Sequence, residues 1–172
     1  TKALLFDETG TIVRRTDCAH RQIVNEKGWV SHDPEEIYRN VLTVVSKLLE
    51  GIDANCVVGV GISNQRETTV AWNKITGKPY GNAVVWQCAR ATKICERESI
   101  VLMADAIQKK TGMNLSPYFP AAKLTWILEN EEGAKEAAGK HEICHGTMDS
   151  WLVYKLTGGK EYRTDYSNAS RT

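Results

Sequence analysis

The sequence has 172 residues, of which 42% are apolar and 25% are charged, and these values fit a globular domain with a sizeable core. The formal net charge is +1 and the basic residues are scattered, which argues against a nucleic-acid or acidic membrane partner. No apolar stretch approaches the roughly 20 residues that a membrane-spanning helix requires.

The N-terminal residues predict a β-hairpin. Two short apolar runs, Ala3–Asp7 and Thr11–Arg15, flank Glu8-Thr9-Gly10, and a three-residue loop that ends in glycine is typical of hairpins. A further extended segment is predicted near His20–Val24.

A helix is predicted to follow Asp33. Asp33 can cap it, Pro34 suits the first helical position, and Glu36 can complete a capping box. Apolar residues then recur at helical spacing as far as Leu49, and Gly51 ends the helix.

Three strands are predicted after this helix. Cys56–Ser63 is dense in valine, isoleucine and glycine and indicates a buried strand, and Thr68–Trp72 forms a second strand after a tight polar turn. We expect a hairpin turn within Asn73–Lys78 and a short strand at Val84–Trp86.

The rest of the chain is predicted to be mainly helical. Because strands come first and helices are interleaved and then dominant, we expect an α/β domain with a mixed sheet flanked by helices. The expected helices are Arg90–Arg97, Val101–Lys110, Pro120–Asn130, Glu131–Ala138 and Ser150–Leu156, and Gly158-Gly159 stops the last of them.

Polar residues follow the predicted buried strand directly, at Asn64–Thr68. Ligands of α/β sheets gather at the carboxyl ends of strands. Arg66 offers several hydrogen-bond donors and Glu67 offers two acceptor oxygens, a combination that suits the vicinal hydroxyls of a polyol. The alternative for this pair is an ordinary surface ion pair in a turn.

Two aromatic residues are further candidates for a polyol site. Trp86 closes a short apolar run, and Tyr118 lies between Pro117 and Phe119 in a predicted loop. Aromatic rings can cover the carbon atoms of a small polyol, and a tyrosine hydroxyl can add a polar contact. Ordinary core packing is the alternative for each ring.

Several segments resemble the glycerol kinases of the FGGY carbohydrate kinase family. They follow in order along essentially the whole chain and read GWVSHDPEEIY, GISNQRETT, NAVVWQC, SPYF, GTMDSWLVYKLTGG and TDYSNASRT. The stretch NQRETT at Asn64–Thr69 is the most specific, since kinases for xylulose or ribulose in that family carry other residues there.

The resemblance implies a fold, a site and a reaction. The fold would be the ribonuclease H-like, actin-like ATPase domain, with residues 1–172 as a partial N-terminal domain that binds the acceptor. Glycerol would contact Arg66, Glu67, Trp86 and Tyr118. The complete enzyme would transfer the γ-phosphoryl group of ATP, with Mg²⁺, to a terminal hydroxyl of glycerol, and it would be cytoplasmic and homo-oligomeric.

The chain departs from the family pattern at both ends, which we expect to be cuts. The family opens with a D-x-G-T-T-S-x-R loop for ATP phosphate and magnesium, of which only Thr1 and Lys2 would remain. The catalytic aspartate and the ATP-binding C-terminal domain would lie beyond Thr172, so the chain alone is expected to be inactive. Asp7–Thr11 looks superficially like the phosphate loop, but its glycine falls one position too late, and the hairpin is favoured.

One further pattern suggests zinc. His141–His145 spells HExxH, which in zinc proteases requires a stable helix. Gly139 and Gly146 leave too few residues between them for such a helix, so a short extended segment is expected and no metal is assigned.

Two acidic residues near the C-terminal end are assigned supporting roles. Asp149 is expected to cap the helix that begins at Ser150. Asp165 lies in the TDYSNAS stretch and is expected to shape the floor of the site. Trp29, Trp126 and Trp151 are interpreted as packing residues.

Two other functions stay open on these residues. One is a kinase for another polyol or a ketose, and the other is a noncatalytic polyol-binding module. The five cysteines contain no CxxC pair, and their odd number argues for reduced thiols in a cytosolic protein.

Overall fold

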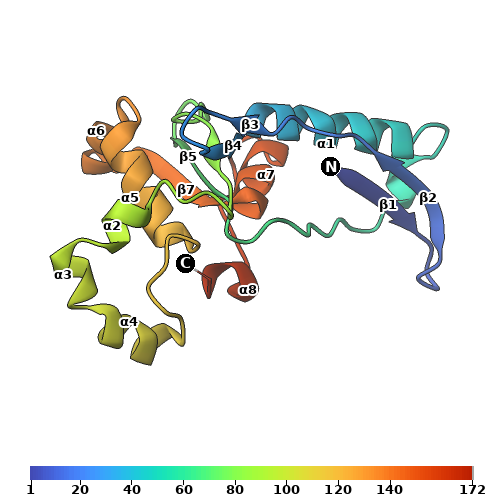
Figure 1. The fold of residues 1–172 in the computed structure, drawn as a ribbon. Coiled ribbons are helices and arrows are strands. Elements are labelled where there is room, and N and C mark those ends of the chain that lie inside the picture. The colour runs from blue at the N-terminus through green and yellow to red at the C-terminus, as the bar shows by residue number, and fades with distance from the viewer. Residues whose placement is uncertain (172) are drawn as a thin grey trace.

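Two β-sheets organise the chain in the computed structural model, which describes residues 1–171 (Figure 1). One is a hairpin of β1 (Lys2–Phe6) and β2 (Ile12–Asp17). The other has five strands in the order β3-β4-β6-β5-β7. Every strand pair within residues 1–171 is antiparallel, so the α/β class is confirmed but the expected mixed sheet is wrong for this part of the chain. Its strands are β3 (Ile23–Val24), β4 (Val30–His32), β5 (Thr69–Asn73), β6 (Ala83–Val84) and β7 (Ile143–Thr147).

Eight α-helices accompany these strands within residues 1–171. None of them is long and apolar enough to cross a membrane. They are α1 (Pro34–Leu48), α2 (Thr92–Cys95), α3 (Glu98–Val101), α4 (Ala104–Thr111), α5 (Pro120–Asn130), α6 (Ala134–Gly139), α7 (Met148–Leu156) and α8 (Tyr166–Ala169).

The predicted N-terminal hairpin is confirmed. The Asp7 carboxylate accepts hydrogen bonds from the backbone N–H groups of Thr9 and Thr11 at 2.9 and 3.0 Å, and Gly10 adopts a φ of 83°. Only a residue that tolerates positive φ fits such a turn without strain. Asp7–Thr11, which looks superficially like a phosphate loop, therefore forms the hairpin turn, as the sequence favoured.

Helix α1 begins as the sequence predicts, with one difference. The Asp33 carboxylate caps it by accepting from the N–H of Glu35 at 2.8 Å. The capping box is wrong, because the Glu36 carboxylate accepts instead from the N–H of Arg21 at 2.9 Å. The loop before β3 offers this donor, and Glu36 fastens the loop to the helix.

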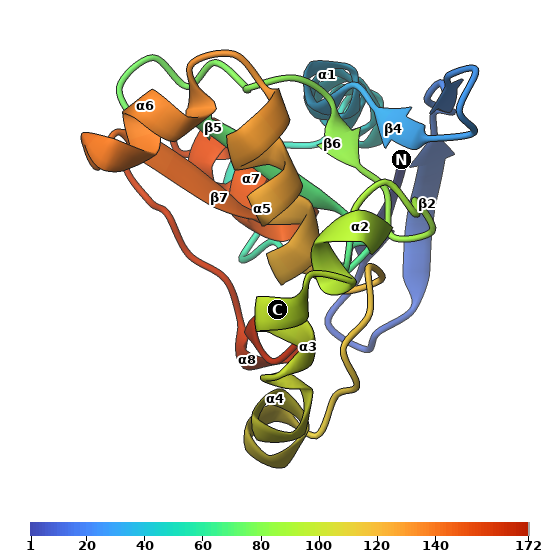
Figure 2. The same cartoon turned by 60° about the vertical axis from the view of Figure 1, so that its left-hand side comes forward.

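The five-stranded sheet is covered on both faces (Figure 2). Because alternate side chains of a strand point to opposite faces, Trp72 of β5 packs with Trp151 of α7, while Ala71 shares a core with Ile127 of α5 and Ala134 of α6. Helices α1 and α7 thus cover one face and α5 and α6 cover the other. This sandwich holds the ends of β5, β6 and β7 in fixed positions.

The predicted buried strand at Cys56–Ser63 is wrong. A short 3₁₀ turn (Ala54–Cys56) leads into extended backbone without ladder pairing, and Val58 and Val60 are exposed. Figure 1 shows this segment running back from the hairpin toward β5. An apolar run becomes a buried strand only where neighbouring strands pair with it, and here β1 pairs with β2 alone.

Most other elements agree with the sequence-based expectation. Helix α5 has the predicted bounds, whereas the predicted helix Val101–Lys110 starts later, as α4, after the separate short helix α3. The turn within Asn73–Lys78 is confirmed by a hydrogen bond from the N–H of Asn73 to the carbonyl of Lys78 at 2.8 Å. Trp151 is fully buried, as expected of a packing residue.

Candidate functional site

The candidate site lies where three distant segments end beside one another. Glu67 comes just before β5, Trp86 follows β6, and Tyr118 precedes α5. The rings of Trp86 and Tyr118 meet edge to face with their centroids 5.9 Å apart. Trp86 is 40% exposed, so one part of its ring is open to a ligand. The structure therefore brings together the two aromatic residues predicted for the site.

Glu67 is linked to the aromatic side of the site through Arg171 and Phe119. The Arg171 Nε donates to Glu67 Oε1 at 2.8 Å, and its guanidinium lies 5.4 Å from the centre of the Phe119 ring. The Glu67 carboxylate, and to a lesser extent the nearby Tyr118 side chain, raises the pKa of Arg171. Arg171 was missed as a site residue, although it lies in the TDYSNASRT stretch, whose last residue, Thr172, is outside the described residues.

Arg66 makes no polar contact with the other residues of this cluster within residues 1–171. Its side chain is exposed, and within residues 1–171 it makes no hydrogen bond or ion pair. The alternative of a mutual surface ion pair with Glu67 is wrong, because Glu67 is buried and pairs with Arg171. The Arg66 guanidinium is thus left with its donors available to a ligand.

A buried lysine supports the aromatic side of the site. Lys123 of α5 has no exposed surface, and its Nζ donates to the carbonyl oxygen of Tyr118. Burial lowers its pKa to about 8, and nearby Cys88, Glu67 and Cys95 oppose that shift. The sequence carried a signal for it, because Lys123 occupies the buried phase of the helix.

Asp149 connects the turn before β5 to the rest of the site. The predicted capping role is wrong, because α7 begins at Met148 and Asp149 lies inside its first turn. Its carboxylate accepts from Asn64 Nδ2 at 3.0 Å, from Thr164 Oγ1 at 2.7 Å and from the hydroxyl of Thr147. A buried carboxylate needs such donors, and these three fix the Asn64 turn against β7.

Asp165 orders the segment that carries Arg171. It caps α8 by accepting from the Asn168 N–H at 2.8 Å, and these bonds lower its pKa. Asn168 in turn accepts from the Thr147 hydroxyl at 3.3 Å. Asp165 therefore acts on the site through the backbone of α8.

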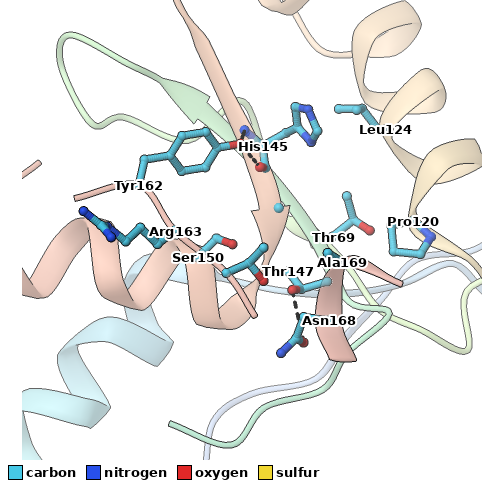
Figure 3. A pocket seen from close by; sticks show the side chains of 12 residues that line it. Thr69, Pro120, Leu124, His145, Thr147, Ser150, Tyr162, Arg163, Asn168 and Ala169 are labelled. Carbon is cyan, nitrogen blue, oxygen red and sulfur yellow. Dashed lines mark hydrogen bonds between the residues drawn. The ribbon is translucent and has the colours of Figure 1, made fainter. Parts of the chain in front are cut away.

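A cavity of about 390 Å³ adjoins the cluster (Figure 3). Figure 3 shows the Thr147 hydroxyl and Asn168 amide on its wall. Three lining residues, Thr69, Pro120 and Ala169, each lie two positions along the chain from Glu67, Tyr118 and Arg171 respectively. The cavity and the cluster thus share three segments, and β7, the start of α7 and the segment after α7 complete the lining of the cavity. Small molecules commonly bind in such cavities.

The HExxH pattern does not lie on a helix. His141 is in a turn with a φ of 58°, and His145 belongs to β7, which confirms the extended conformation expected from the flanking glycines. Burial lowers the pKa of His145. All five cysteines are free thiols.

The residues considered for ATP and magnesium lie in the hairpin. The ammonium group of Thr1 donates to the Cys18 carbonyl at 2.8 Å, and Lys2 opens β1. Residues 1–171 contain no group of three or more His, Cys, Asp or Glu side chains arranged to hold a metal ion. A contact of Thr1 and Lys2 with ATP phosphate stays a prediction.

Comparisons with known proteins agree on one family. The pattern of the FGGY family of carbohydrate kinases, N-terminal domain, matches residues 1–172. The chain is 50% identical to glycerol kinase 1 of Thermotoga maritima and 45% identical to the glycerol kinase of Bacillus licheniformis. Each alignment covers all of this chain and 35% of the relative, so the chain spans about a third of their length.

Solved structures show the same likeness. The glycerol kinase of Plasmodium falciparum with ADP is 35% identical, with a TM-score of 0.91 over 99% of this chain and 34% of that one. The fold is shared by a gluconate kinase from Lactobacillus acidophilus, which is 24% identical to this chain. The TM-score is 0.82, and the alignment covers 99% of this chain and 33% of the gluconate kinase. The expected ribonuclease H-like, actin-like ATPase fold is confirmed.

Proposed function

The chain belongs to the FGGY family of carbohydrate kinases, and from this premise we propose that it is the acceptor-binding part of an ATP-dependent glycerol kinase. The observation that carries the proposal is that Glu67, just before β5, is linked through Arg171 and Phe119 to the ring pair of Trp86, after β6, and Tyr118, before α5. Relatives 45–50% identical that are named glycerol kinases support it.

The chemistry of the cluster suits glycerol. Glu67 can accept hydrogen bonds from two hydroxyls, and the exposed Arg66 can donate to them. The edge-to-face pair of Trp86 and Tyr118 offers an apolar wall for the carbon atoms. Phosphoryl transfer depends mainly on positioning, and these four side chains would point one terminal hydroxyl toward the nucleotide.

The remaining parts of the reaction belong to a polypeptide of the relatives' length. We assign the binding of ATP and Mg²⁺, and the base that accepts the hydroxyl proton, to segments other than residues 1–171. Cytoplasmic location and homo-oligomeric assembly stay predictions. A rival kinase for another polyol or a ketose would use the same fold with different acceptor contacts.

The test is a substrate panel on the protein made from the complete coding sequence. ADP release is measured with glycerol, xylulose, ribulose and gluconate, and glycerol is expected to give the highest kcat/KM. A higher kcat/KM for a ketose would contradict the proposal, and binding of glycerol without ADP release would favour a noncatalytic module.

Arg66→Ala tests the acceptor contacts. We expect it to lower kcat/KM for glycerol roughly tenfold or more, because a charge-assisted hydrogen bond to the acceptor is lost. Arg15→Ala is the control, since Arg15 lies on the exposed hairpin in a loose 3.9 Å pair with Asp17. Equal kinetics of the two variants would remove Arg66 from the site.

A further inference from the structure

The ion pair between Arg171 and Glu67 links the acidic side of the cluster to its aromatic side, because the same guanidinium lies against Phe119. Glu67 is 5% exposed, and its partner reaches it from a segment 104 residues further along the chain. We propose that Arg171 is a positioning residue that fixes Glu67 for the acceptor hydroxyls, an inference that rests on the proposed function.

The pairing leaves part of the carboxylate free. Arg171 Nε binds Oε1 of Glu67, and within residues 1–171 no donor is assigned to Oε2. A carboxylate can accept about four hydrogen bonds. One bond from Arg171 therefore fixes the orientation of the group while oxygen lone pairs stay available for two vicinal hydroxyls.

The Arg171 guanidinium also packs against an aromatic wall formed by Phe119 and Tyr118. This planar group lies 5.4 Å from the centre of the Phe119 ring, which packs edge to face with Tyr118 at 5.3 Å. The Lys123 ammonium holds the Tyr118 carbonyl from the buried side. Arg171 thus sets the separation between Glu67 and the aromatic wall, and this separation decides how well a three-carbon polyol fits.

A lysine could not replace Arg171 in full. An ammonium group can supply the charge, but it lacks the planar guanidinium that packs on an aromatic ring and binds a carboxylate at the same time. The inference therefore predicts a graded series in which Arg171→Lys keeps part of the acceptor affinity and Arg171→Met loses more of it.

The experiment uses the protein made from the complete coding sequence and separates the two substrates. Arg171→Met is expected to raise KM for glycerol roughly tenfold or more, to leave KM for ATP within about twofold, and to be partly rescued in Arg171→Lys. Arg97→Met is the matched control, because it breaks a close arginine–glutamate pair, Arg97 with Glu129 at 2.6 Å, outside the cluster.

A double-mutant cycle with Glu67→Gln completes the test. If Arg171 acts through Glu67, the double variant is no worse for glycerol than Glu67→Gln alone. Additive losses, or the same glycerol KM in Arg171→Met and Arg97→Met, would overturn the inference. If Arg171→Met does not fold, Arg171→Lys carries the test, and an unchanged glycerol KM in that variant would also overturn it.

The outcomes separate this inference from the proposed function. A wild-type protein that does not phosphorylate glycerol contradicts the function itself. A wild-type protein that does so, with Arg171 variants that behave like the Arg97 control, contradicts only the role of Arg171.

Discussion

The five-stranded sheet and the N-terminal hairpin both contain short apolar runs, but most apolar side chains of the sheet are buried and several of those in the hairpin are exposed. In β5, Val70, Ala71 and Trp72 are buried because helices cover both faces of the sheet. In the hairpin, β1 and β2 pack against α1, through bonds such as Thr16 Oγ1 to the Val44 carbonyl at 2.8 Å, and Phe6 is 52% exposed.

The difference explains where the site can form. Hydrogen-bonding side chains at the ends of β5 and β7 are held by a packed core, and Asp149 ties the turn before β5 to β7. The hairpin offers no such enclosure within the described residues, and its polar turn residues satisfy one another. Rigid support is what a binding site needs, so the cluster lies on the covered sheet.

The largest expected effect tests the covered sheet directly. Trp72 is fully buried and packs against Trp151, Tyr154 and Tyr162 with ring centroids 5.3 to 5.5 Å apart. Trp72→Ala is expected to cost about 3–5 kcal/mol in the free energy of unfolding, measured by urea denaturation. The matched change on the hairpin, Phe6→Ala, is expected to cost about 1 kcal/mol. Similar losses would mean that the two regions are equally packed.

The second effect concerns the buried charge of Lys123 and its dependence on pH. Its pKa in the folded chain is about 8 against 10.5 for the free side chain, so between these pH values the unfolded state binds more protons. Lys123 therefore contributes a rise in the free energy of unfolding with pH in this window, of roughly 3 kcal/mol at about 1.4 kcal/mol per pH unit. The raised pKa values of Cys95, Cys144 and Tyr162 act in the opposite direction. The contribution of Lys123 is therefore read from the difference between wild type and variant.

Lys123→Met should remove the contribution of Lys123. The measurement is the difference between wild type and variant in urea midpoints at pH 7 and pH 10.5. Leu124→Met on the same helix controls for altered packing and should keep the pH dependence of wild type. A Lys123→Met profile parallel to wild type would show that the ammonium is solvated.

A third effect acts on the helix that touches both regions. Asp33 caps α1, which packs on the hairpin and on α7. Asp33→Ala is expected to lower the free energy of unfolding by about 1 kcal/mol, because one N–H group at the helix start loses its partner. Asp33→Asn retains an acceptor and should restore most of the stability. Equal melting temperatures for Asp33→Ala and wild type would contradict this role.

The smallest effect is expected in the extended segment. Val58 is fully exposed, so Val58→Ser should change the free energy of unfolding by less than about 0.5 kcal/mol. The same substitution at the buried Val70 of β5 should cost several times more, about 2 kcal/mol or above. A comparable loss at Val58 would indicate that this segment is packed in solution.

Local signals were enough to predict individual elements. The proline at the first position of α5, the cap at Asp33 and the glycine of the hairpin turn act over a few residues, and these elements formed as predicted. The resemblance of the NQRE, VWQ and PYF stretches pointed to Glu67, Trp86 and Tyr118 as glycerol contacts, which stays a prediction. The structure packs Trp86 against Tyr118 and links Glu67 to the neighbouring Phe119 through Arg171.

The sequence by itself determined the α/β class, the family and most helix positions, because these depend on short-range periodicity and on motifs read in order. Only the tertiary structure decided which partner each polar group takes. Glu67 pairs with Arg171 and Asp149 binds Asn64 across 104 and 85 residues of chain, and the apolar run at Cys56–Ser63 found no neighbouring strand. Such outcomes depend on which segments the fold places side by side, and residue spacing carries no information about that.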